Sequence, residues 1–114
     1  KHPLSFPKQP VDISHESFEK EVKEQPGIVL LEFWSPQCVH CLEIAPVIDE
    51  LAVQKAGILK IARINVLDNG GMALQFDVRG TPTFVLFRDG EKIGRIDGAP
   101  AAHELKEWIE TRLQ

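Results

Sequence analysis

The segment Ile28–Trp34 is apolar at nearly every position and places the strongest constraint on the fold of this sequence. A strand with one face in water alternates apolar and polar residues. This run does not alternate, so it predicts a central strand that is buried on both faces. Glu32 is the only charged residue within it. A helical pattern begins soon afterwards, at Cys38. The arrangement predicts a sheet covered by helices on both faces.

The remaining elements are predicted from hydrophobic periodicity and from turn residues. In the first half we predict an edge strand near Val11–Ile13, a helix over His15–Lys23 with Ser14 as N-cap, a helix from Cys38 to about Lys55 with a kink at Pro46, and a strand over Leu59–Asn65. In the second half we predict a short helix from Met72 to about Phe76, a hairpin of Phe84–Phe87 and Glu91–Asp97 that turns at Asp89-Gly90, and a helix over Ala101–Leu113. The fold class is therefore α/β, in the order β-α-β-α-β-α-β-β-α. We expect a central mixed sheet of about five strands flanked by about four helices.

Length and composition indicate one globular domain. The chain has 114 residues, of which 43% are hydrophobic and 26% are charged. Residues 1–10 contain three prolines and predict an irregular lead-in, followed by a single domain over 11–114. The net charge is −4 without a basic cluster, which argues against a nucleic-acid partner. The longest apolar runs fall well short of the roughly 20 residues of a membrane span. A monomer is expected.

Cys38 and Cys41 are the only cysteines and lie at the start of a predicted helix. Cysteines three residues apart can close a small reversible disulfide there, and a helix N-terminus favours a thiolate. Three alternatives to a redox pair stay open. A structural disulfide across so short a loop removes little entropy from the unfolded chain. A zinc site would use Cys38, His40 and Cys41, but no second cysteine pair completes it. The third alternative is two ordinary buried cysteines.

Several separated motifs resemble those of the thioredoxin family. They are Leu31-Glu32-Phe33-Trp34 before the cysteine pair, Ile44-Ala45-Pro46 within the helix, Arg79-Gly80-Thr81-Pro82-Thr83, Leu86-Phe87-Arg88-Asp89-Gly90, and Gly98. Their order and spacing match the family from about Val11 to Leu113. The resemblance implies the thioredoxin fold over nearly the whole chain.

The resemblance also implies roles for residues of the site. Cys38 matches the exposed nucleophilic cysteine of the family and Cys41 the resolving one. Pro82 matches the proline that follows a cis peptide bond beside the disulfide and that receives the substrate chain together with Thr81. Trp34 matches the tryptophan that packs under the active-site loop.

Four residues are expected to adjust the chemistry of the pair. Glu32 stands where the family usually has a buried aspartate, and Arg63 stands where a lysine partners that acid. A buried carboxylate has a raised pKa and can exchange a proton with Cys41. His40 and Thr81 resemble the oxidising and isomerising branches of the superfamily more than thioredoxin itself. We expect His40 to stabilise the Cys38 thiolate.

These observations predict a thiol–disulfide oxidoreductase that exchanges electrons with protein disulfides through Cys38 and Cys41. We expect it to be less reducing than a typical thioredoxin and to work with a redox partner protein. No metal, nucleotide or flavin cofactor is implied. The alternative is a non-catalytic thioredoxin-like adaptor. The sequence does not distinguish cytoplasm from periplasm, because a reactive cysteine pair can operate in either compartment.

Overall fold

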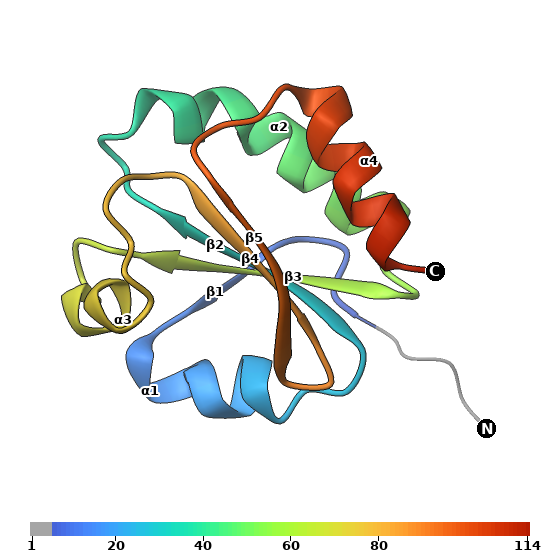
Figure 1. Ribbon diagram of the computed structural model, residues 1–114, viewed down its shortest axis with the longest axis horizontal. Helices are drawn as coiled ribbons and strands as arrows, with labels where there is room; N and C mark the ends of the chain where they lie inside the picture. The colour runs from blue at the N-terminus through green and yellow to red at the C-terminus, as the bar shows by residue number, and fades with distance from the viewer. Residues whose placement is uncertain (1–5) are drawn as a thin grey trace.

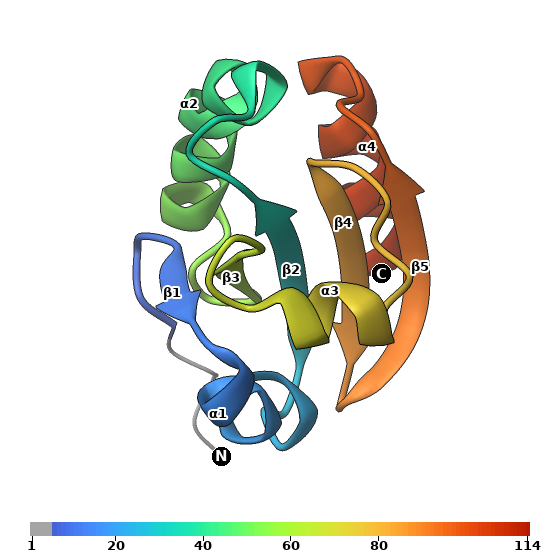
Figure 2. The same ribbon diagram turned by 90° about the vertical axis from the view of Figure 1, so that its left-hand side faces the viewer.

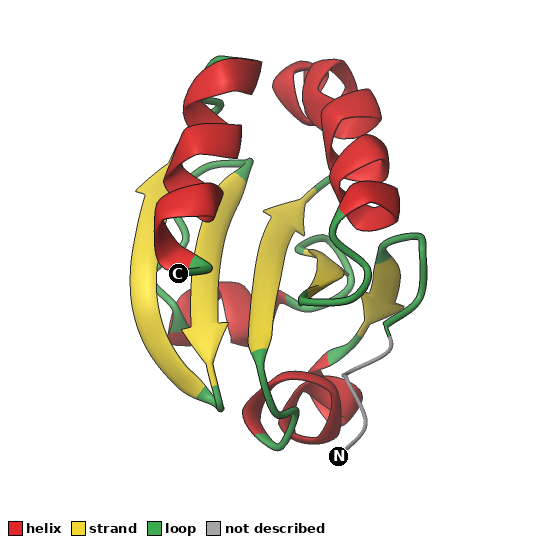
Figure 3. Cartoon of the chain, turned by 90° about the vertical axis from the view of Figure 1, so that its right-hand side faces the viewer, coloured by secondary structure: helices red, strands yellow, loops and turns green. Residues whose placement is uncertain are grey.

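A five-stranded mixed sheet forms the centre of the computed structural model, which describes residues 6–114. The strands are β1 (Val11–Ile13), β2 (Ile28–Trp34), β3 (Leu59–Asn65), β4 (Thr83–Arg88) and β5 (Glu91–Asp97), in the spatial order β1-β3-β2-β4-β5. The contacts of β3 with β1 and β2 are parallel, and those of β4 with β2 and β5 are antiparallel (Figure 3). The predicted mixed sheet with a terminal antiparallel hairpin is confirmed.

The helices cover both faces of this sheet. They are α1 (His15–Phe18) with the π-helical segment η1 (Glu19–Lys23), α2 (Val39–Gln54), α3 (Gly70–Gln75) and α4 (Ala102–Arg112). Helices α2 and α4 lie together on one face, and α1 and α3 lie on the other (Figures 1 and 2). In the part of the chain that the structure describes, no helix has both the length and the apolar character of a membrane span.

Strand β2 is central and buried on both faces, as predicted. Its side chains alternate between two hydrophobic cores. Ile28 and Leu30 pack in the core beneath α2 and α4, whereas Val29, Leu31 and Phe33 pack in the core against α1, η1 and α3. This double burial explains why the strand has almost no polar residues.

The predicted element boundaries needed small corrections. The helix expected over His15–Lys23 divides into α1 and η1, with Ser14 as N-cap and with Glu24 N–H donating to the Glu19 carbonyl at 2.8 Å. The short helix begins at Gly70 instead of Met72. The predicted lead-in has no regular helix or strand over residues 6–10, and its first five residues lie outside the described part. Pro46 lies inside α2, and the kink expected there stays a prediction.

The turn between β4 and β5 requires glycine at Gly90. Asp89 has φ 49° and Gly90 has φ 85°, so two successive residues are left-handed, as in the tight turns that Asp-Gly favours. A Cβ on Gly90 would lie 2.2 Å from the Lys23 carbonyl oxygen. Asp89 also accepts a hydrogen bond from Gly27 N–H at 2.8 Å, which ties the turn to the start of β2.

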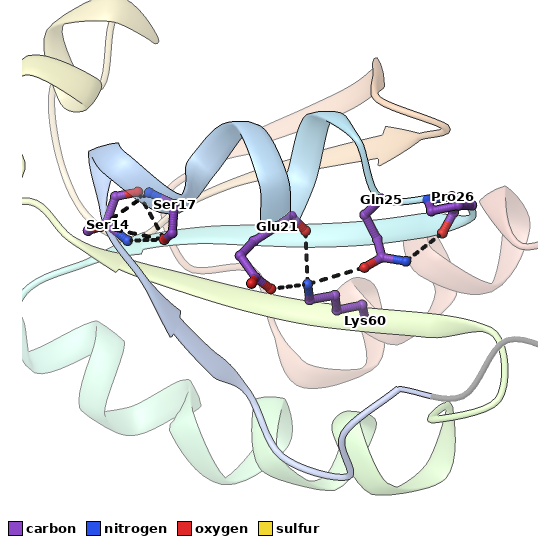
Figure 4. Close-up of polar contacts among 6 residues, drawn as sticks. All are labelled: Ser14, Ser17, Glu21, Gln25, Pro26 and Lys60. Carbon is purple, nitrogen blue, oxygen red and sulfur yellow. Dashed lines mark hydrogen bonds and ion pairs between the residues drawn. The ribbon is translucent and has the colours of Figure 1, made fainter.

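Lys60 is a buried cation on the α1 side of the sheet. It is 4% exposed, and its ammonium donates to the Glu21 carbonyl at 2.9 Å, to Glu21 Oε1 at 2.5 Å and to Gln25 Oε1 at 3.4 Å (Figure 4). The contacts join β3 to η1 and to the loop that enters β2. The hydrogen bond from Lys60 lowers the pKa of Glu21.

Replacing Lys60 with methionine should lower the free energy of unfolding by about 2 kcal/mol, because several charge-assisted hydrogen bonds are lost. Lys55→Met is the matched control, since Lys55 pairs with the more exposed Glu110 and should cost less than about 1 kcal/mol. Because the Glu21 pKa is lowered on folding, its contribution is present above the unfolded pKa and is lost as pH falls through the folded pKa. Urea unfolding at neutral and acidic pH measures both effects, and equal losses in the two variants would contradict a special role for Lys60.

Candidate active site

Cys38 caps the N-terminus of α2 and lies next to Cys41. The two sulfur atoms are at disulfide-bonding distance, with their Cα atoms 5.2 Å apart. Cys38 is the N-cap, with φ −90° and ψ 110°, and the helix begins at Val39. The sequence had predicted that the helix begins at Cys38 itself. The Cys41 backbone N–H donates to Cys38 Sγ at 3.1 Å. The Cys38 sulfur therefore has a donor that would stabilise a negative charge on it.

The two cysteines differ in exposure, as the sequence predicted. Cys38 is partly exposed, whereas Cys41 is fully buried on the face of α2 that carries Ile44 and Ile48. The turn that connects β2 to α2 is held by Ser35, whose carbonyl accepts from Cys38 N–H at 3.1 Å. A partner sulfur has access only to the first cysteine, which suits an attacking role for Cys38 and a resolving role for Cys41.

The loop that contains Thr81 and Pro82 lies at the same edge of the sheet as the cysteine pair. The antiparallel pairing places Phe33 of β2 opposite Thr83 of β4. Ser35, Gly80 and Thr81 are among the residues that line a cavity of about 330 Å³. The Thr81–Pro82 peptide bond is cis.

Glu32 is a fully buried carboxylate beneath α2. Its side chain lies on the same face of β2 as Leu30, and it accepts a hydrogen bond from Arg63 Nε at 2.9 Å. Burial raises the pKa of Glu32, and the Arg63 guanidinium opposes that rise without cancelling it. Its second oxygen, Oε2, has no hydrogen-bond partner among residues 6–114. A carboxylate with a raised pKa is a stronger base than an ordinary one, which suits it to accept and return a proton.

Trp34 is half-buried at the end of β2 and stacks with Arg63. The guanidinium carbon lies 4.1 Å from the centre of the indole ring. Arg63 therefore contacts Glu32 and Trp34 together, and its side chain remains 19% exposed. The Glu32–Arg63 pair that the resemblance implied is present in the structure, and Trp34 lies beside it.

His40 points along the surface of α2 towards Glu43. Its Nδ1 lies 3.1 Å from Glu43 Oε1, and the two side chains are 70% and 67% exposed. In this disulfide form the imidazole therefore interacts with a carboxylate. Glu43 was not among the predicted site residues, although its spacing of three residues on a helix is the signal that predicts such a pair.

The described residues contain no group of three or more histidine, cysteine, aspartate or glutamate side chains arranged to hold a metal ion.

Exposed apolar side chains lie near the start of α2. Val39 is 63% exposed, Leu42 is 59% exposed, and Leu67 in the loop before α3 is 56% exposed.

Comparisons with known proteins agree with this geometry. The Thioredoxin family model matches residues 9–111. The chain is 34% identical to Thioredoxin 1 of Nostoc sp. over 101 residues, which cover 89% of this chain and 94% of that protein. It is 37% identical over 92 residues to protein disulfide-isomerase A3 of Gallus gallus, covering 81% of this chain and 18% of that longer protein. A mutant thioredoxin from Halobacterium salinarum NRC-1 superposes with a TM-score of 0.86 at 31% identity, covering 96% of both chains.

Proposed function

Since this chain belongs to the thioredoxin family and is a thiol–disulfide oxidoreductase, we propose that its substrates are the disulfides of other proteins and that Cys38 attacks them. The observation that carries the proposal is the unequal cysteine pair, with Cys38 partly exposed at the helix N-cap and Cys41 buried behind it. We also infer that residues 11–114 form a single domain. A separate redox partner protein is proposed to return the cysteine pair to its starting redox state after each exchange.

In the reducing direction, the Cys38 thiolate attacks one sulfur of a client disulfide. A bond forms between Cys38 and that sulfur, and the other client sulfur leaves as a thiolate that takes up a proton. Cys41 then loses its proton and attacks Cys38 Sγ. The second client thiol is released, and the enzyme ends in the Cys38–Cys41 disulfide form. Reversal of the same steps oxidises a client dithiol.

The start of α2 supports the role of Cys38. Its sulfur already accepts the Cys41 N–H at 3.1 Å, and the partial positive charge of the helix N-terminus favours the thiolate over the thiol. At an unperturbed pKa of about 8.5 only a few per cent of a thiol is ionised at pH 7, so this stabilisation increases the fraction of Cys38 that can attack.

Glu32 is proposed as the group that accepts the Cys41 proton in the second step. Both side chains lie between the sheet and α2, and burial raises the pKa of Glu32. Arg63 orients the carboxylate from the neighbouring strand. Trp34, Thr81 and Pro82 are proposed to contact the client chain.

Reduction of insulin disulfides with dithiothreitol as electron source tests the proposed substrate class. Turnover that saturates with insulin supports a protein-disulfide oxidoreductase. A chain that binds partners as an adaptor would show none, even though Cys38 and Cys41 are intact.

We propose further that the Cys38–Cys41 couple is less reducing than that of thioredoxin, nearer to about −200 mV than to about −270 mV. A shift of about 70 mV corresponds to about 3 kcal/mol of extra stabilisation of the dithiol form. The helix terminus is common to the fold, so the difference is assigned to groups near the thiolate that differ from those of thioredoxin, of which His40 is the first candidate.

The contribution of His40 can be separated by two variants that act in opposite directions. His40→Gln removes the imidazole and should make the potential about 20 mV more negative. Glu43→Gln releases the imidazole from its partner at 3.1 Å and should make the potential less negative by a similar amount. Equilibration with glutathione measures both values. If neither variant shifts the potential, His40 has no tuning role.

A further inference from the structure

Arg95 on β5 holds the loop that leads from α3 to Pro82. Its Nη1 donates to the Phe76 carbonyl and its Nη2 donates to the Asp77 carbonyl at 2.9 Å. Asp77 is left-handed, with φ 54°, a conformation that a residue other than glycine adopts only at a cost. The guanidinium bonds to the two carbonyls at this turn and so fixes where the loop begins.

The far end of the loop belongs to the same network. Arg95 Nε donates to Asp97 Oδ1 at 3.0 Å. The hydroxyl of Thr83 lies 3.5 Å from the same Asp97 oxygen and donates to the Gly80 carbonyl at 2.8 Å. Thr83 is 1% exposed. A chain of side-chain contacts on β4 and β5 therefore connects Phe76 and Asp77 with Gly80, which immediately precedes Thr81.

A planar guanidinium suits this task better than an ammonium. Arginine presents several N–H donors in a rigid plane, so one side chain can bond two carbonyls and a carboxylate at the same time. The side chain of Arg95 is only 24% exposed, which limits competition from water. Arg79 lines the same open cavity as Arg95, yet it is 85% exposed, and within residues 6–114 its side chain bonds only to the Asp77 carboxylate, at 3.1 Å.

We propose that Arg95 is a positioning residue for exchange with protein disulfides, because it fixes the loop that carries Thr81 and Pro82 at the same end of the sheet as the cysteine pair. The inference rests on the proposed function, in which that loop contacts the client. Arg95 has no hydrogen bond to Cys38, Cys41 or Glu32 among the described residues, so its loss leaves the reactivity of the sulfur atoms unchanged.

Three variants test the proposal in the insulin assay. Arg95→Gln should raise the KM for insulin about tenfold with little change in kcat, since a misplaced loop weakens client binding. Arg95→Lys should raise the KM for insulin less than Arg95→Gln does, because lysine keeps the charge but lacks the planar donors. Arg79→Gln removes the same charge from the same cavity. Its rise in the KM for insulin should be about fivefold smaller than the rise caused by Arg95→Gln.

Two further measurements separate positioning from damage to the pair. In Arg95→Gln, the alkylation rate of Cys38 and the glutathione equilibrium of the pair should stay within twofold of the original protein. If both change as much as the insulin KM, or if KM is unchanged, the proposal is wrong. If Arg95→Gln does not fold, Asp97→Asn serves instead, with an expected threefold rise in KM, and an unchanged KM there overturns the proposal. If the unaltered protein does not turn over insulin, the proposed function itself fails, whatever Arg95 does.

Discussion

Replacing Cys38 with serine should abolish insulin reduction, with a loss of at least about 10³-fold, because no other described thiol is accessible to a client sulfur. Cys41→Ser should also stop turnover, but at a different step. Its Cys38 thiolate still attacks, and without the resolving thiol the mixed disulfide accumulates. The pair of variants thus separates attack from resolution.

Each variant is mixed with native, disulfide-bonded insulin. Mass spectrometry then identifies the trapped species. Cys41→Ser should carry an insulin chain on Cys38, whereas Cys38→Ser should carry none. Alkylation of the reduced protein at neutral pH should modify the partly exposed Cys38 before the buried Cys41. Equal trapping by the two variants, or equal alkylation of the two thiols, would show that the assigned order of attack is wrong.

Replacing Glu32 with glutamine should stabilise the protein at alkaline pH by about 1–3 kcal/mol, because it removes a buried charge. Burial raises the folded-state pKa of Glu32 above its unfolded value. Stability from this group is therefore fully present below the unfolded pKa and is lost as pH rises through the folded pKa. Glutamine resembles the protonated acid and does not titrate, so the variant should keep that stability at high pH.

The same substitution should slow the second chemical step. Glutamine cannot accept the Cys41 proton, so resolution of the mixed disulfide should slow by about 10²-fold while alkylation of Cys38 is unaffected. Stopped-flow measurement of client release checks the slower step, and urea unfolding checks the stability. Both are measured between pH 5 and pH 9, a range set by the raised pKa of Glu32 and the ordinary thiol pKa of about 8.5.

Glu21→Gln is the matched control for stability, because the hydrogen bond from Lys60 lowers the pKa of Glu21 by more than burial raises it. That variant should lose stability at neutral pH. If Glu32→Gln is less stable than the original protein at pH 9, the bond from Arg63 outweighs the cost of burying the charge.

Much of the scaffold could be predicted because strands and helices depend on local patterns. The predicted bounds of β2, β3 and β5 agree with the structure, since the apolar run of β2, the partial alternation of β3 and the Asp89-Gly90 turn before β5 mark them. The helix ends were less accurate, because periodicity does not locate the cap. The π-helical geometry of η1 was not predicted, since it involves hydrogen bonds that no periodic pattern reports.

Within the site, the spacing of Cys38 and Cys41 gave the chemistry, and Glu32 was conspicuous as a lone charge in an apolar strand. Arg95 gave no such signal. Its partners Phe76 and Asp77 lie on a distant segment, and the sequence places Arg95 in an ordinary exposed hairpin. Contacts of this kind depend on how the elements pack, so only the three-dimensional structure identifies them.

The central position of β2 has a consequence for hydrogen exchange. Strand β2 is paired on both sides and leads directly into the turn before Cys38. We expect its amide hydrogens to exchange with solvent only through global unfolding, whereas those at the start of α2 should also exchange through local opening. Reduction and oxidation of the cysteine pair should therefore alter amide protection at the first turn of α2, while the protection of β2 should follow global stability.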